Sequence, residues 1–570
     1  MRKKWTFLKS DPGLTHYLQQ SLGIHPVVAA ILVQRGITDP VQASTFLNPN
    51  LNHLHDPFRM HGMNHAVPRL IQAVESKEKI LLYGDYDVDG ITSIVLMFEF
   101  LEKLGAEVDF YLPDRYSEGY GVSDEGISYA VQKGVGLLIT LDCGMQATRQ
   151  IESARALGID TIICDHHQAG ETLPPAVAVL NPKQPNCLYP FKELSGCGIA
   201  FKLIQALMQV RPEWAMPLEP MLEWVVLSIA ADLVELTGEN RILAFFGLQA
   251  LNRSRRPGVN ALIEQSRRTR PLRINDIVYG LGPLINAAGR MADAGKAVQL
   301  LLAQHPHVAA DYARVLTYRN NLRREYDRTM AREATGLWEA QPGHSERRSI
   351  VLYQSHWHKG IAGIAAARMV DQYQRPAVIL TGSKEKAVGS ARSVPGVDLY
   401  KILSGCKDLL INFGGHQYAA GLSILPEYIP AFSDRMEALI QIHYPQVFQA
   451  TFPIAVQMDW ADIDGDFWED YKKLAPFGPG NRTPVFASMK VESTGASQEM
   501  GDNHLRCTLV QEGFAMPCIG FSLYQTWVAC KGHILDVCYT LDEQEWRGSA
   551  FMRLELKDIR THKYSGVTIQ

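Results

Sequence analysis

The stretch of sequence that decides the fold is residues 79–93, which read KILLYGDYDVDGITS. Its apolar run, ILLY, is followed by three aspartates in alternating positions, Asp85, Asp87 and Asp89. A short apolar run that ends in polar residues predicts a buried β-strand, and Gly90 predicts a turn from the acidic residues into a helix. The stretch therefore predicts a strand that carries three carboxylates at its end.

The same pattern recurs further along the chain. Apolar runs lie at residues 107–113, 135–144 and 160–167, which read EVDFYLP, VGLLITLDCG and DTIICDHH. Amphipathic spacing predicts helices between them over residues 92–104 and 146–157. Strands that alternate with helices form parallel βαβ units, in which helices cover both faces of the sheet and ligands bind at the carboxyl ends of the strands. We therefore expect an α/β fold built on a parallel sheet.

The rest of the sequence predicts further domains. One long helix is expected over about residues 314–339, and a second, smaller α/β unit begins at RRSIVLYQS. Short alternating strands after residue 450 are typical of a small β-barrel of the OB type. The predicted limits are 1–55 for a helical segment, 56–275 for the first α/β domain, 276–345 for a connecting segment with the long helix, 346–445 for the second α/β domain and 446–570 for the barrel.

The charge of the chain is unevenly distributed. The formal net charge of -4 over 570 residues argues against a nucleic-acid partner, because phosphates are bound by lysine and arginine. Residues 253–273, however, contain Glu264 as their only acid among many arginines, and Arg324, Arg328 and Arg332 recur every four residues. On a helix these three side chains form one stripe. The pattern predicts an acidic metal site beside a basic groove.

The cysteines and the hydrophobic runs limit the class of protein. Nine cysteines are scattered without a CxxC pair, which indicates neither a disulfide framework nor a zinc ribbon. We therefore expect a reducing, cytoplasmic environment. No apolar run is as long as a membrane span, and none follows the basic start MRKKW, so we expect a protein that is neither exported nor embedded in a membrane.

The predicted strand ends carry the candidate chemistry. Besides the three alternating aspartates, Asp142 follows one apolar run, and Asp165, His166 and His167 follow the next. Asp232 ends another apolar segment, WVVLSIAAD, and is expected at the same edge. Neighbouring carboxylates repel one another and raise each other's pKa, so a divalent cation is their natural partner. Oxygen and imidazole ligands without thiolates favour Mn²⁺ or Mg²⁺, and imidazole favours Mn²⁺.

Each of these pieces also has a structural interpretation. A single aspartate after a strand is commonly a helix cap or a turn former, which applies to both Asp142 and Asp232. The DHH triplet alone is compatible with a solvated loop. The same kind of signal at the same end of successive strands favours a metal site over these alternatives.

Several segments resemble a known family. GDYDVDG, LITLDCG, CDHH and AADLVEL are similar to the successive motifs of the DHH phosphoesterase superfamily, in their usual order. Five further segments resemble the RecJ branch of single-strand-specific exonucleases. They are GPLINAAGRM, SHWHKGIAGIAAAR, GSARS, FGGHQYAAG and APFGPGNRTPVF. The match covers roughly residues 45–490 by motif and the tail by fold. His356 and Arg482 depart from the usual wording, and neither is an expected metal ligand.

The resemblance implies a metal-dependent exonuclease that hydrolyses single-stranded DNA 5′ to 3′ to 5′-mononucleotides, in recombination and repair. It implies two ions, Mn²⁺ or Mg²⁺, which make hydroxide from water and stabilise charge at phosphorus. Asp142 would bridge the two ions, Asp85 would be a ligand or a close neighbour of one, and His167 would contact the scissile phosphate or assist the leaving oxygen. The implied metal ligands are Asp85, Asp87, Asp89, Asp142, His166 and Asp232.

The resemblance also implies a DNA-binding set, within a second domain of the DHHA1 type and around it. Its members are Arg115, Arg290, His358, Arg368, Ser390, Arg392, Gly414, Gly415 and His416. Arg290 ranks first because a guanidinium can grip two phosphate oxygens, and Arg115 would gate the 5′ terminus. The alternatives are solvated surface arginines, an ion-pair role for Arg368, and a plain turn at the two glycines. The barrel would add stacking and backbone charge.

Three functions remain open from the sequence. The first is the exonuclease, a monomer on single-stranded DNA, with single-strand-binding protein and a helicase as implied partners. The second is a DHH phosphodiesterase for short oligonucleotides or cyclic dinucleotides, which needs no terminal barrel. The third is a binding module without activity, which would have lost metal ligands that this sequence keeps.

Overall fold

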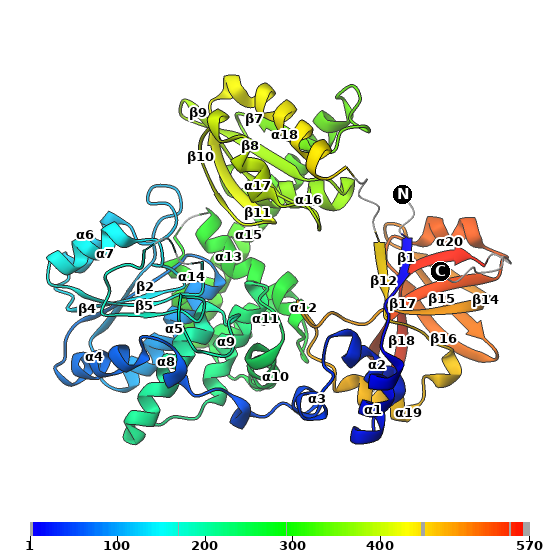
Figure 1. Ribbon diagram of the computed structural model, residues 1–570, viewed down its shortest axis with the longest axis horizontal. Helices are drawn as coiled ribbons and strands as arrows, with labels where there is room; N and C mark the ends of the chain where they lie inside the picture. The colour runs from blue at the N-terminus through cyan, green and yellow to red at the C-terminus, as the bar shows by residue number, and fades with distance from the viewer. Residues whose placement is uncertain are drawn as a thin grey trace. The chain divides into compact units, whose positions relative to one another are not determined.

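The computed structural model describes residues 4–562, apart from residues 169, 171, 292, 446–450 and 547–548. The chain forms two compact units, each assembled from segments that are distant in sequence. The first described below, the catalytic unit, combines Asp56–Asp232 with Phe246–Ala450. The second, the barrel unit, combines Met1–His55, Leu233–Phe245 and Thr451–Gln570. The colours of Figure 1 show these segments along the chain.

The catalytic unit contains the predicted parallel sheet, with strand order β3-β2-β4-β5-β6. The five strands, all parallel, are β2 (Ile80–Gly84), β3 (Val108–Tyr111), β4 (Leu137–Leu141), β5 (Asp160–Cys164) and β6 (Ala178–Leu180). Every residue of β2 and β4 is buried, as expected for central strands that are covered on both faces. The predicted α/β fold class is confirmed.

Helices cover both faces of this sheet (Figure 1). On one side lie α4 (Met63–Glu75), α5 (Val88–Lys103), α8 (Gly196–Val210) and α9 (Glu219–Ala231). On the other side, α6 (Asp124–Gln132) and α7 (Thr148–Ala156) pack Ile127 and Ile151 against Leu81 and Leu138 of the strands. The sheet is therefore the middle layer of three, and only its ends remain open to ligands.

A helical region follows the sheet. Its members are α10 (Gly238–Arg253), α11 (Pro257–Ser266), α12 (Ile274–Asp276), the π-helical turn η4 (Ile277–Leu281), α13 (Gly282–Met291), α14 (Gly295–Leu302) and α15 (Pro306–Glu339). The predicted long helix is present as α15 and begins earlier than expected. None of the helices in the described part of the chain combines the length and hydropathy that a membrane span needs.

The second α/β layer of the catalytic unit is a mixed sheet of order β10-β11-β9-β8-β7. Its strands are β7 (Ile350–Gln354), β8 (Ala377–Ser383), β9 (Lys386–Arg392), β10 (Leu410–Gly415) and β11 (Ala419–Ile424). One face packs on α15 and α16 (Ala362–Tyr373), and the other on α17 (Leu399–Ser404) and α18 (Ile429–His443).

The barrel unit closes β14-β15-β16-β18-β17 into a ring through the β14–β17 pairing, with β13 attached to β14. Its strands and helices are β13 (Val456–Gln457), β14 (Phe486–Met500), β15 (His504–Gln511), β16 (Phe514–Gly520), β17 (Leu535–Trp546), β18 (Ser549–Thr561), α19 (Gly465–Lys472) and α20 (Tyr524–Cys530). The predicted OB-type barrel is therefore present. Strand β16 was not predicted, because FAMPCIG contains a proline and lacks clear alternation.

The N-terminal residues belong to the barrel unit. Strand β1 (Lys4–Phe7), which was not predicted, pairs in parallel with β12 (Thr451–Ile454). Helices α1 (Pro12–Leu22), α2 (Pro26–Gln34) and α3 (Pro40–Leu47) each begin at a proline. Proline suits the first helical position because the N–H that it lacks would have no partner there. Leu18, Val28 and Leu32 of these helices share one core with Phe467 and the barrel.

Short 3-10 turns connect these elements. They are η1 (Leu51–His53), η2 (Pro57–Arg59), η3 (Pro212–Trp214), η5 (Lys359–Ile361), η6 (Lys407–Leu409), η7 (Pro426–Tyr428) and η8 (Trp460–Asp462).

Candidate metal centre

The strand register places three acidic residues at one edge of the parallel sheet. Gly84 of β2 is level with Leu141 of β4, and Leu141 is level with Cys164 of β5. The residues that follow them are Asp85, Asp142 and Asp165, so the three strands deliver a carboxylate at the same height. Asp142 adopts a left-handed backbone with φ of 60°, a conformation that aspartate tolerates better than most residues.

Helix α5 delivers two further carboxylates. The Asp87 side chain caps the helix and accepts the N–H of Asp89 at 2.9 Å, and Asp89 lies in the first turn. Gly90 is inside the helix and does not form the turn that the sequence predicted. Gly90 instead lets the backbone of α5 lie against the backbone of Asp85, because a Cβ at Gly90 would lie 2.2 Å from the Asp85 carbonyl oxygen. The missing side chain lets α5 begin directly against the end of β2.

Asp232 reaches the same cluster from a helix and not from a strand end. It follows α9 and its backbone N–H bonds to the Ser228 carbonyl. The sequence expectation was therefore wrong about the element, because an apolar run without clear periodicity fits a buried helix as well as a strand. The expected position of the side chain is unaffected, since its Oδ2 lies 3.5 Å from His166 Nε2.

His166 is the centre of the arrangement. Besides the contact with Asp232, its Nε2 lies 3.1 Å from Asp142 Oδ1 and 3.7 Å from Asp89 Oδ2. Three overlapping groups of side chains offer ligand atoms close enough to share an ion. They are Asp142 with His166 and His167; Asp89 with His166 and Asp232; and Asp85 with Asp87 and Asp142.

Buried polar atoms without a partner mark the same place. Asp85 Oδ1, Asp142 Oδ1 and both ring nitrogens of His166 make no hydrogen bond within the described part of the chain. An unsatisfied buried polar atom costs about 1–3 kcal/mol, so a native site seldom carries several without a ligand. Carboxylate oxygens and a neutral imidazole suit Mn²⁺ or Mg²⁺. The residues present therefore fit a divalent metal.

The electrostatics of the cluster point in the same direction. Burial, and then repulsion from neighbouring aspartates, raises the pKa of Asp85, Asp142 and Asp232 well above the ordinary value and raises that of Asp87. Burial also lowers the pKa of His166, which favours the neutral ring that metals bind. A cation at the centre would relieve these penalties.

His167 differs from His166 in its charge. Burial opposes protonation, but the hydrogen bond of Nδ1 to Asp165 Oδ1 at 2.7 Å and the Asp165 charge outweigh it and raise the pKa of His167 to about 9. Asp165 is held in turn by the N–H groups of Met145 and His167, each at 3.0 Å. The Tyr120 hydroxyl lies 3.2 Å from His167 Nε2. The ring is therefore a fixed cation beside the carboxylates.

Cationic side chains border the carboxylates. Arg115 lies over the Tyr86 ring, and its charge acts on Asp85. Burial, and then Arg115 with other arginines, lowers the pKa of Arg290 to about 10. Arg290 donates to the Gly360 carbonyl at 3.1 Å. Burial and Arg115 also lower the pKa of Arg392. Arginines that repel one another in a buried place create a site for an anion.

His358 lies in the same neighbourhood. Its ring stacks on Tyr326 at 5.3 Å between centroids, and its Nδ1 accepts the Gly360 N–H. Burial, and then Arg115, lowers its pKa, so the ring is neutral. Tyr116 donates its hydroxyl to the carbonyl of Arg290 beside this ring.

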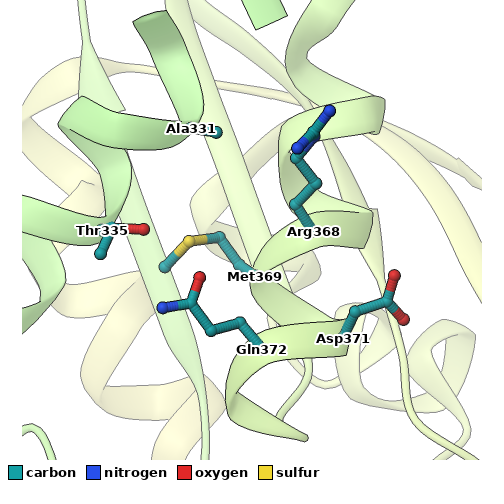
Figure 2. Close-up of a pocket in the computed structure, with 6 residues that line it drawn as sticks. All are labelled: Ala331, Thr335, Arg368, Met369, Asp371 and Gln372. Atoms are coloured by element: carbon teal, nitrogen blue, oxygen red, sulfur yellow. The ribbon is translucent and has the colours of Figure 1, made fainter. Parts of the chain in front are cut away.

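Other predicted DNA-binding residues are placed differently. Arg368 pairs with Asp327 at 2.7 Å and lines a pocket of about 420 Å³ between α15 and α16, which Figure 2 shows. This contact supports the alternative prediction that Arg368 is an ion-pair partner. Ser390 lies on β9 near the N-terminus of α16. Gly414 and Gly415 are the last residues of β10, and His416 is the first residue of the turn to β11.

Some residues at the site were not singled out from the sequence. Asn286 of the INAAG segment accepts the N–H of Val88 and so anchors the start of α5. Gly289 lets α13 approach, because a Cβ there would lie 2.5 Å from the Tyr86 carbonyl oxygen. Arg323, outside the predicted stripe, is the α15 arginine whose charge acts on Arg290. The stripe was predicted from four-residue spacing alone, which does not show whether the side of α15 that carries Arg323 or the side that carries Arg324 lies towards Arg290.

Comparison with known proteins gives the family. Models of three domains match the chain: the DHH family N-terminal domain at residues 79–229, the DHHA1 domain at 347–442 and the RecJ OB domain at 454–558. The sequence is 34% identical to the single-stranded-DNA-specific exonuclease RecJ of Bacillus subtilis, over 98% of this chain and 71% of that protein. This chain belongs to the RecJ family.

Further RecJ proteins match over most of their length. The RecJ exonuclease of Haemophilus influenzae is 32% identical over 94% of this chain and 96% of that protein. The crystal structure of RecJ from Thermus thermophilus in complex with Mn²⁺ superposes with a TM-score of 0.82 at 25% identity. The superposition covers 98% of this chain and 80% of that one. The RecJ fold thus extends through both units.

Proposed function

We propose that this chain is a metal-dependent exonuclease that hydrolyses single-stranded DNA from the 5′ end to 5′-mononucleotides, in recombination and repair. One observation carries the proposal. Ligand atoms of several carboxylates and of His166 lie close enough together to share an ion, and some of them make no hydrogen bond within the described part of the chain. Membership of the RecJ family supports the substrate class, because relatives bear the name single-stranded-DNA-specific exonuclease.

We assign each side chain of the centre a role. The residues that would hold Mn²⁺ or Mg²⁺ are Asp85, Asp87, Asp89, Asp142, His166 and Asp232. Bound ions supply Lewis-acid chemistry, since they lower the pKa of water and neutralise charge at a phosphate. His167, held as a cation by Asp165, donates a hydrogen bond to a phosphate oxygen or a proton to the leaving oxygen.

We assign the DNA strand to the cationic border of the centre. Arg115, Arg290 and Arg392 are half-buried and repel one another, and a phosphate group would relieve that repulsion. This border would be extended along the DNA strand by Ser390, His358 and the end of β10 with the residue after it, that is Gly414, Gly415 and His416. Arg368 has the least support among these assignments, because its guanidinium already pairs with Asp327.

The test is digestion of one oligonucleotide labelled at either end, as single strand and as duplex, with and without Mn²⁺. We expect a 5′ label to be released first as a mononucleotide and a 3′ label to remain on strands that become shorter. Both results should require Mn²⁺ and should occur with the single strand but not with the duplex. Shortening from the 3′ end would contradict the polarity. Faster turnover of dinucleotides than of long strands would favour the small-substrate phosphodiesterase.

We also propose a cytoplasmic monomer that meets single-strand-binding protein and a helicase. All nine cysteines are buried, which is compatible with a reducing compartment. Light scattering after size exclusion tests the monomer, and co-purification with single-strand-binding protein tests the partner.

A further inference from the structure

The carboxylate of Asp89 is held differently from its neighbours. Its Oδ2 accepts the N–H of Gly196 at 2.7 Å, and its Oδ1 accepts the N–H of Cys197 at 2.8 Å and the hydroxyl of Ser228 at 2.7 Å. The two amides belong to the first turn of α8, a helix of 15 residues whose N-terminus favours an anion. Asp85 and Asp142, in contrast, each have one oxygen that accepts no hydrogen bond from the residues that the structure describes.

The hydroxyl protons have a single consistent order. A carboxylate without a proton can only accept, so Ser228 gives its one proton to Asp89. Ser195 Oγ lies 2.6 Å from Ser228 Oγ and must therefore supply the proton between them. Ser195 Oγ remains free to accept the N–H of Gly198, at 3.2 Å. Both serines are fully buried, so water does not compete for these bonds.

Counting acceptor positions shows what remains of Asp89. A carboxylate offers about four lone-pair positions, two on each oxygen. Ser228 and Cys197 fill both positions on Oδ1, and Gly196 fills one on Oδ2. The last position is on Oδ2, the oxygen that lies 3.7 Å from His166 Nε2.

We propose that Ser228 is a positioning residue that, with the amides of Gly196 and Cys197, locks Asp89 so that it presents one oxygen, Oδ2, to a divalent ion. The inference rests on the proposed metal-dependent function. Gly196 also lies against Asp142, where a Cβ would come within 2.7 Å of the Asp142 Cβ. The start of α8 therefore fixes the mutual placement of two expected ligands.

Ser228→Ala tests the proposal in the full-length protein. The variant frees a position on Oδ1 and lets the carboxylate turn, so we expect a dissociation constant for Mn²⁺, measured by titration calorimetry without DNA, about tenfold above wild type. Saturating Mn²⁺ should restore most of the turnover on single-stranded DNA. Ser228→Cys keeps a weak donor, so its Mn²⁺ affinity should lie between those of wild type and the alanine variant.

Ser254→Ala is the matched control. Ser254 is also buried and also donates at 2.7 Å to a buried carboxylate, that of Glu223 in α9, which is not part of the centre. The Mn²⁺ affinity of the Ser254→Ala variant should equal that of wild type. An unchanged affinity in Ser228→Ala, or an equal loss in Ser254→Ala, would overturn the positioning role. If Ser228→Ala does not fold, an unchanged affinity in Ser228→Cys overturns it.

The wild-type protein separates this inference from the proposed function. A wild type that binds no Mn²⁺ and degrades no DNA refutes the function. A wild type that does both, with serine variants that behave like it, refutes only the role of Ser228.

Discussion

Two buried charged places in this chain are built in opposite ways. In the barrel unit, Arg241 of α10 is 2% exposed, and its guanidinium donates to the carbonyls of Phe46, Lys473, Leu474, Ala475 and Pro476 at 2.7–3.5 Å. Five donors meet five acceptors. In the catalytic unit, Asp85, Asp142 and His166 of the carboxylate cluster each have a buried atom without a hydrogen bond to any described residue.

The difference separates a structural charge from a functional one. Arg241 is saturated by backbone and also lies 3.8 Å from the centre of the Phe46 ring, so it offers nothing to a ligand. It fixes the APFGP segment against α3 and α10, and this accounts for a motif that the function does not use. The aspartates are equally buried, but their bonding is incomplete. Incomplete bonding of buried charge is the better guide to a site.

Asp142→Asn sharpens the comparison most. The amide keeps the size of the side chain but removes the charge that faces His166, so we expect cleavage of single-stranded DNA to fall at least about 10³-fold, or about 4 kcal/mol. Turnover of an end-labelled oligonucleotide measures it. Asp124→Asn, an exposed position paired with Arg149, is the control and should retain wild-type turnover. Wild-type turnover in Asp142→Asn would refute the site.

Arg241→Met tests the structural charge in the barrel unit. The variant removes the guanidinium donors of the Phe46, Lys473 and Ala475 carbonyls. Asn481 still donates to the carbonyls of Leu474 and Pro476. We therefore expect the free energy of unfolding to fall by about 3 kcal/mol. Urea denaturation followed by tryptophan fluorescence measures the change, and Mn²⁺ affinity should be unaffected. Arg506→Met, at an exposed barrel position, should stay within about 0.5 kcal/mol. A loss of Mn²⁺ affinity in Arg241→Met would break the distinction between the two places.

His167→Asn asks whether the charged histidine belongs to chemistry or to metal binding. Asp165 keeps the ring protonated, so we expect turnover to fall about 100-fold while the affinity for Mn²⁺ is unchanged. Calorimetry and single-turnover cleavage measure the two quantities. A parallel loss of both would identify His167 as a metal ligand instead.

The pH dependence of the metal-free protein gives the smallest effect. The pKa of Asp85, Asp142 and Asp232 is raised in the folded chain above about 3.9, the value in the unfolded chain. The folded state then binds more protons, so stability rises as pH falls from neutral towards the unfolded value. We expect the melting temperature in EDTA to increase by a few degrees between pH 7.5 and 5.5, and Mn²⁺ to abolish the increase. A decrease on acidification would contradict the burial of these carboxylates.

Most of the fold was predictable from local patterns. Strands β2, β4 and β5 are short apolar runs followed by polar residues, and the long helix α15 ends at the predicted residue, Glu339. Strand β1 was missed because the strand that it pairs with, β12, lies in another part of the sequence. The KWTF segment alternates polar and apolar residues and contains strand-forming side chains, but four residues are too short a stretch to indicate a strand on their own.

The candidate site was predictable where chemistry and position coincide. Asp85, Asp142 and His166 follow strands, and the rules for parallel sheets place such residues at one edge. Ser228 and Asn286 could not be found, because a single serine or asparagine in an apolar helix is usually a packing or backbone contact. Their contacts with Asp89 and Val88 depend on how α9 and α13 pack against α5, which one sequence does not encode locally.

The pairing of β1 with β12 has a consequence for synthesis. Lys4 pairs with Thr451, so β1 leaves the ribosome long before β12 and waits for this partner until nearly the whole catalytic unit has been made. At about 5–20 residues per second, the delay is roughly 20–90 s. During this time the apolar faces of α1 and α2 have no barrel to pack on. The catalytic unit can therefore mature before β1, α1 and α2, although these are translated ahead of it.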